Sequence, residues 1–140
     1  MNFDVEKYFP YDAIRPAQQD AIDFAINAFT NDKKRFVIIE AGTGVGKSAI
    51  GLTVGRYMRG LYDLDDETSE GSYFLTTQKI LQDQYIKDFS SACGGMRSIK
   101  SSSNYQCSFH KKNTCAESLR ALKVAEKGSR FWKSCVFNCN

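Results

Sequence analysis

A glycine-rich stretch, Ala41-Gly42-Thr43-Gly44-Val45-Gly46-Lys47-Ser48, constrains the fold of this chain more than any other feature. The short apolar run before it, residues 36–39, predicts a strand covered on both faces in a parallel sheet. The residues after it, 47–62, predict a helix. Glycines let consecutive backbone N–H groups curve around phosphate oxygens, and the positive end of the helix dipole attracts the same anion. The sequence therefore predicts a strand–turn–helix unit that binds phosphate.

Two polar side chains complete a P-loop of the Walker A type. The Lys47 ammonium can reach the β- and γ-phosphates of a nucleotide and the Ser48 hydroxyl can ligate Mg²⁺, so both are candidate catalytic residues. Ala41 stands where the strict pattern has its first glycine, and the plain alternative is a glycine turn that only caps a helix. We predict that ATP and Mg²⁺ are bound by seven residues: Gly42, Thr43, Gly44, Val45, Gly46, Lys47 and Ser48.

The rest of the first 96 residues alternates between helical and strand patterns. Residues 15–29, with Pro16 at a first helical position, predict a helix, and residues 73–75 and 78–89 predict a second strand and helix. This order is typical of an α/β layer built from βαβ units. Residues 63–70 hold five carboxylates in eight positions and predict an exposed loop. The predicted fold class is therefore α/β.

Charge divides the 140 residues at about position 97. Residues 1–96 carry ten Lys and Arg against fourteen Asp and Glu, a balance of −4, whereas residues 97–140 carry nine against two, a balance of +7. A basic segment of this kind favours a polyanionic partner. Within it, Thr114 and Glu117 form a capping-box pattern for a short helix that Gly128 would end. We predict an ATP-binding domain over residues 1–96 and a basic, cysteine-rich domain over residues 97–140.

The N-terminus and the hydropathy exclude two settings. Residues 1–6 form neither a basic nor an apolar region of a signal peptide, and no apolar run approaches the roughly 20 residues of a membrane span. We expect a protein that is not secreted, has no membrane partner, and works in the cytoplasm, in the nucleus or in a viral setting.

Residues upstream of the P-loop offer a site for adenine. A glutamine amide both donates and accepts hydrogen bonds, so Gln18 can read the edge of adenine while an aromatic ring such as Tyr11 covers its face. Arg15 lies between them in sequence and is the third candidate. The plain alternative is a proline-started helix with exposed glutamines and core aromatics.

Four stretches together resemble the start of an XPD/DinG-type superfamily 2 DNA helicase. They are Phe9-Pro10-Tyr11-Asp12 with Pro16 and Gln18, the P-loop, Leu75-Thr76-Thr77-Gln78 with Leu81 and Gln84, and Ile99 to Cys107 with its Asn104-Tyr105-Gln106-Cys107 end. The resemblance covers nearly the whole chain. It implies a partial RecA-like sheet of the first helicase domain, a Thr77 side chain near the nucleic-acid backbone, and an iron–sulfur insertion at the C-terminal end.

Four cysteines in the basic segment are candidate metal ligands: Cys107, Cys115, Cys135 and Cys139. Four thiolates could hold a [4Fe–4S] cluster or Zn²⁺, and the plain alternative is unligated cysteines. Seven, nineteen and three residues separate them, a spacing that fits neither a double CxxC zinc site nor a ferredoxin run and so does not choose between these alternatives. His110 adds a possible zinc ligand. The resemblance implies the cluster. Cys93 is expected to be an ordinary, partly buried thiol.

Basic and aromatic residues around the cysteines suit unpaired nucleic acid. Cations neutralise phosphates and flat rings stack on bases. Lys100, Lys111 and Lys112 are the candidate DNA contacts, and the predicted partners are single-stranded and forked DNA. A small domain also needs a core, so most of its rings are expected to pack inside.

The combined reading is the N-terminal part of an ATP-dependent DNA helicase that translocates on single strands and unwinds duplexes. The acidic Asp-Glu-x-His motif of such motors is not found in the sequence, so we expect the second RecA-like domain and that motif in a remainder of the helicase chain, and negligible hydrolysis by these residues alone. The alternative is a P-loop module without motor activity that carries a zinc-stapled, nucleic-acid-binding tail. A small P-loop kinase would leave the cysteines and the basic segment unexplained.

Overall fold

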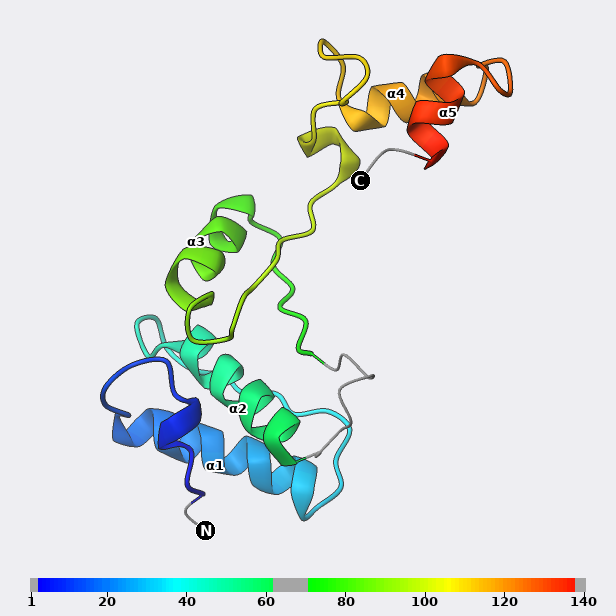
Figure 1. The fold of residues 1–140 in the computed structure, drawn as a ribbon. Coiled ribbons are helices and arrows are strands. Elements are labelled where there is room, and N and C mark those ends of the chain that lie inside the picture. The colour runs from blue at the N-terminus through cyan, green and yellow to red at the C-terminus, as the bar shows by residue number, and fades with distance from the viewer. Residues whose placement is uncertain (1–2, 62–70, 138–140) are drawn as a thin grey trace. The chain divides into compact units, whose positions relative to one another are not determined.

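A computed structural model describes residues 3–61 and 71–137 of the chain, which Figure 1 shows as a mainly helical ribbon. The chain divides into two compact units, one formed by Met1–Thr77 with Lys87–Met96 and the other by Gln78–Ile86 with Arg97–Asn140. The helical elements in chain order are η1 (Glu6–Tyr8), α1 (Pro16–Thr30), α2 (Lys47–Leu61), α3 (Lys79–Phe89), η2 (Ser102–Asn104), α4 (Cys115–Leu122) and α5 (Arg130–Phe137). None of the helices in the described ranges is both long and apolar enough to cross a bilayer.

The three helices expected in the first 96 residues are confirmed. α1 begins at Pro16, whose missing N–H costs nothing in a first turn, and the Gln18 side chain accepts a hydrogen bond from the N–H of Arg15 at 2.9 Å. α2 begins at Lys47, directly after the glycine-rich stretch, and α3 covers the segment expected from residues 78–89. Local sequence signals were sufficient for these elements.

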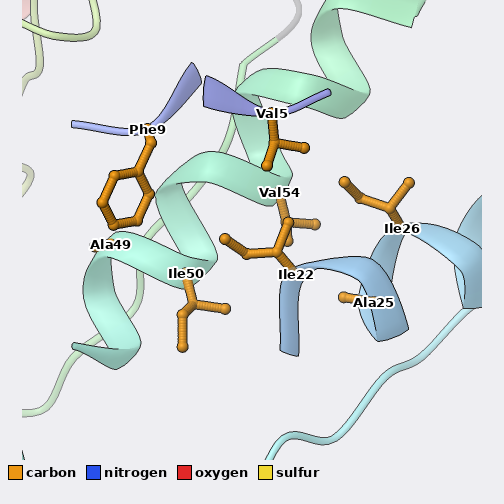
Figure 2. Packing of buried hydrophobic residues seen from close by; sticks show 8 residues of the cluster. All are labelled: Val5, Phe9, Ile22, Ala25, Ile26, Ala49, Ile50 and Val54. Atoms are coloured by element: carbon orange, nitrogen blue, oxygen red, sulfur yellow. The ribbon is translucent and has the colours of Figure 1, made fainter. Parts of the chain in front are cut away.

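The core of the first unit lies where α1 packs against α2 (Figure 2). Side chains three and four positions apart form one apolar face on each helix, and the N-terminal segment around η1 covers them. Burying each aliphatic side chain contributes about 1.5–3 kcal/mol, so this cluster holds both helices that flank the P-loop. Its members are Val5, Phe9, Ile22, Ala25, Ile26, Ala49, Ile50 and Val54.

Neither expected strand is seen as a strand in this structure. Val37 and Ile39 pack against the core, but Phe36 and Ile38 are 83% and 90% exposed, so the burial expected on both faces of residues 36–39 is found on one face only. In residues 73–75, likewise, Tyr73 and Leu75 are about nine-tenths exposed. A strand needs neighbouring backbone to pair its N–H and C=O groups in a ladder, and neither segment is part of a ladder in the described residues. The α/β fold class therefore stays a prediction.

The second unit is built around short helices. Thr114 Oγ1 accepts from the N–H of Glu117, and the Glu117 carboxylate accepts from the N–H of Thr114, so the predicted capping box is confirmed. The predicted helix end at Gly128 is wrong: α4 ends at Leu122, and Gly128, with φ +90°, lies shortly before α5. α5 has no counterpart among the expected elements. The expected acidic loop, residues 63–70, lies outside the described residues.

Candidate functional site

The P-loop carries the backbone that phosphate binding needs. Gly44 and Gly46 have φ values of +81° and +89°, a left-handed conformation that side chains with a Cβ rarely adopt. Gly42, Thr43 and Gly44 are exposed, whereas Val45, Gly46 and Ser48 are half-buried. Since α2 starts at Lys47, the loop delivers the chain into a helix N-terminus, whose partial positive charge favours an anion.

The Lys47 side chain folds back over the start of the loop. Its Nζ donates to the carbonyl oxygens of Ala41 and Gly42, at 2.9 and 3.0 Å, in an exposed position. These neutral acceptors hold the ammonium beside the loop, and a phosphate oxygen is a stronger, charged acceptor for the same donor. The Lys47 ammonium could therefore exchange its two carbonyl acceptors for a phosphate oxygen.

Two of the three candidate adenine-binding residues form hydrogen bonds with the P-loop itself. Gln18 is 3% exposed and its Nε2 donates to the Val45 carbonyl at 2.8 Å, while Arg15 Nη1 donates to the Gly44 carbonyl at 3.4 Å. Tyr11 is 55% exposed and meets Phe9 and Phe89 edge to face, at ring-centroid distances of 5.9 and 6.2 Å. Reasoning from sequence missed the two loop contacts, because nothing local in α1 signals which backbone carbonyls lie beside it.

Thr77, the candidate contact to the nucleic-acid backbone, is exposed at the end of the first unit's longer segment. It lies two residues before α3.

Two of the four candidate metal ligands lie on one small hairpin of the second unit. Gln106 and Thr114 form an antiparallel bridge, with hydrogen bonds from Cys107 N–H to the Asn113 carbonyl and from Cys115 N–H to the Tyr105 carbonyl, at 2.9 and 2.7 Å. Because side chains alternate between the faces of paired strands, Cys107 and Cys115 share one face.

The Cys107 thiol has polar neighbours although it is buried. The Ser118 hydroxyl, and after it the hydrogen bond from the backbone N–H of His110, lower the pKa of Cys107, and these effects outweigh the opposite effect of burial. The His110 N–H to Cys107 Sγ distance is 3.2 Å. Nδ1 of His110 is buried and has no hydrogen-bond partner among the described residues. Sequence reasoning missed Ser118, since a single serine in a helix carries no signal.

A complete metal site is not assembled in the described part of the chain. Cys135 is half-buried on α5, and Cys139 lies outside the described residues. No three His, Cys, Asp or Glu side chains within residues 3–61 and 71–137 come together as a metal would require. Cys93 is a half-buried free thiol, as expected.

The candidate DNA contacts differ in their surroundings. Lys111 and Lys112 are exposed, whereas Lys100 pairs with Asp83 at 2.5 Å. The Tyr105 hydroxyl accepts from the N–H of Lys100 at 2.9 Å, so this ring of the Asn-Tyr-x-Cys stretch braces the chain that precedes it.

Other rings of the second unit pack on one another. Phe131 lies 5.5 Å from Phe109 and 4.5 Å from His110 between ring centroids, and Trp132 is half-buried. Phe109, Phe131 and Trp132 are half-buried and Tyr105 is exposed, so none of these four rings is fully buried as a core residue would be.

Residues 12–129 match the family described as the res subunit of type III restriction enzymes, ResIII. No curated protein and no solved structure matches the chain. Nothing in the comparisons speaks for the XPD/DinG subgroup or for an iron–sulfur domain. The match spans the P-loop, the segment before it and most of the basic segment. The chain therefore belongs to the ResIII family, and with it to the helicase-like, ATP-dependent enzymes that act on nucleic acids.

Proposed function

We propose that these residues form the ATP-binding part of a DNA helicase that translocates on single strands and unwinds duplexes. The observation that carries the proposal is the P-loop: left-handed Gly44 and Gly46 lead directly into α2, and the Lys47 ammonium lies over the loop. Membership of a helicase-like family adds support. The proposed partners are single-stranded and forked DNA.

The residues at the loop divide the work of holding ATP. The N–H groups of residues 42–48 would bind phosphate oxygens, Lys47 would neutralise the β- and γ-phosphates, and the Ser48 hydroxyl would hold Mg²⁺. Bound Mg²⁺ would supply charge neutralisation between the two terminal phosphates. Because the sequence holds no Asp-Glu-x-His motif, we expect binding with negligible hydrolysis.

Calorimetry with ATP and Mg²⁺ tests the nucleotide site. Lys47→Ala should weaken binding roughly tenfold to a hundredfold, the size expected for a lost charge-assisted hydrogen bond. Lys34→Ala removes an equally exposed lysine outside the loop and should leave binding unchanged. Absence of ATP binding by the unaltered chain, or equal effects of both variants, would refute the nucleotide site.

The proposed metal centre rests on the cysteines and on the resemblance. Cys107, Cys115, Cys135 and Cys139 would supply four thiolates to a [4Fe–4S] cluster, or to Zn²⁺ in a P-loop module without motor activity. The shared face of Cys107 and Cys115 is compatible with such ligands, whereas the described residues do not gather a third.

Metal analysis of protein purified without oxygen separates these outcomes. Iron and sulfide with a brown colour support the cluster, colourless protein with zinc supports the module, and metal-free protein rejects both.

A further inference from the structure

Two side chains, one from α1 and one from its N-cap residue, donate hydrogen bonds to backbone carbonyls of the P-loop. Gln18 Nε2 donates to the Val45 carbonyl at 2.8 Å and Arg15 Nη1 donates to the Gly44 carbonyl at 3.4 Å. The same Gln18 amide accepts from the Arg15 N–H through Oε1, so both ends of the amide are engaged and the side chain is fixed. Gln18 is 3% exposed and both of its hydrogen bonds are partly buried, which strengthens them relative to bonds in water.

A hydrogen bond that holds a backbone carbonyl in place also fixes the direction of the N–H group of the following residue. In a trans peptide the C=O of one residue and the N–H of the following residue point in opposite directions, and no peptide bond in the described chain is cis. When α1 holds the Gly44 and Val45 carbonyls, the N–H groups of Val45 and Gly46 must point away from α1. Among the described residues, nothing accepts a hydrogen bond from these two N–H groups.

We infer that Gln18, assisted by Arg15, is a positioning residue for the triphosphate: Gln18 sets the Gly46 N–H, and Arg15 the Val45 N–H, to receive phosphate oxygens before any nucleotide arrives. The inference rests on the proposed ATP site and deepens it. Orienting donors in advance removes an ordering cost from binding. On this account Gln18 acts on the phosphates through the loop, and its contribution does not require the adenine base.

A ligand without a base separates this role from adenine recognition. We would titrate tripolyphosphate and ATP separately into the chain and into Gln18→Met, which keeps the length and burial of the side chain but loses both its donor to Val45 and its acceptor for the Arg15 N–H. We expect Gln18→Met to weaken both ligands by the same factor, about three- to tenfold for the lost hydrogen bond to the loop. Gln19→Ala is the control, because Gln19 bonds Asp23 rather than the loop and should leave both affinities unchanged.

Different outcomes refute different claims. Weaker ATP binding with unchanged tripolyphosphate binding would show that Gln18 reads the base and would overturn the inference. Binding of ATP without any binding of tripolyphosphate would also overturn it, since a prepared loop must hold phosphates alone. A chain that binds neither ligand would reject the nucleotide site itself and the inference with it.

Amide NMR of the unaltered chain gives a test that no folding defect of a variant can obscure. Tripolyphosphate should shift the N–H resonances of Val45 and Gly46 more than those of the exposed Lys33 and Lys34, which lie in the turn after α1. Val45 and Gly46 resonances that stay in place while the ligand binds would exclude the role assigned to Gln18.

Discussion

At the scale of single residues, Gly46 is the most constrained position of the loop. Its φ of +89° suits glycine, and a Cβ added there would lie 2.6 Å from Gln18 Nε2. The two constraints are independent, since one comes from the backbone and the other from a side chain 28 positions earlier. Gly42 has neither constraint, because its φ is not positive and no atom lies within 4 Å of an added Cβ.

Gly46→Ala should therefore destabilise the chain. The left-handed backbone costs about 1–2 kcal/mol for a residue with a Cβ, and displacing Gln18 adds the loss of its bond to Val45. Urea denaturation measures the effect, and Gly42→Ala, expected to change stability by less than about 0.5 kcal/mol, is the control. Equal free energies of unfolding for the two variants would contradict this account.

At the scale of elements, helix ends and helix faces are the parts that short sequence patterns specify. The capping box of α4 formed as predicted because its partners, Thr114 and Glu117, are three residues apart. α1 and α2 formed for the same reason: the residues that start each helix, and the apolar residues that form its buried face, lie within a few positions of one another. The strands expected over residues 36–39 and 73–75 depend instead on distant backbone partners, which short patterns cannot supply.

The apolar face of α1 gives a test of packing. Ile26 is fully buried in the core that α1 forms with α2, so Ile26→Ala should lower the free energy of unfolding by about 2–5 kcal/mol through lost burial and the cavity left behind. Phe24→Ala removes a larger side chain from the exposed face of the same helix and should cost much less. If Phe24→Ala proved the more costly change in thermal or urea unfolding, the assigned core would be wrong.

Acid should open the first turn of α4. Hydrogen bonds from the backbone N–H and then the side chain of Thr114 lower the pKa of the Glu117 carboxyl. A carboxyl whose pKa is lower in the folded state stabilises the fold above its unfolded pKa, and this contribution disappears as the pH falls through the folded pKa. An NMR titration of the Glu117 carboxyl and the neighbouring amides checks this, and Glu117→Gln should remove the pH dependence. A helix start insensitive to acid would contradict it.

At the scale of the whole molecule, the uneven charge is the feature that bears on nucleic acid. Lys111 and Lys112 are exposed in a segment of balance +7, whereas Lys34 and Arg35 are an equally exposed adjacent pair in the segment of balance −4. Lys100 is already paired with Asp83, so part of its charge is neutralised within the protein.

The affinity for single-stranded DNA should therefore depend on salt through Lys111 and Lys112. If both lysines contact phosphates, replacing Lys111 and Lys112 by Gln should reduce the slope of log K against log salt by about 1.4, at roughly 0.7 for each contact. Replacing Lys34 and Arg35 by Gln should leave the slope unchanged. Gel shifts across a salt series measure both, and equal slopes for the two double variants would remove the second unit from the proposed DNA surface.

The sequence alone determined the positions of α1, α2 and α3, the capping box of α4 and the glycine turn before α2. Each depends on residues within one or two helical turns, where propensity and steric limits act directly. Tertiary structure decided that Gln18 bonds the Val45 carbonyl, that Phe36 and Ile38 stay exposed, and that Cys107 is buried. These outcomes join groups that are distant in sequence or depend on packing around them, and only the folded chain brings such partners together.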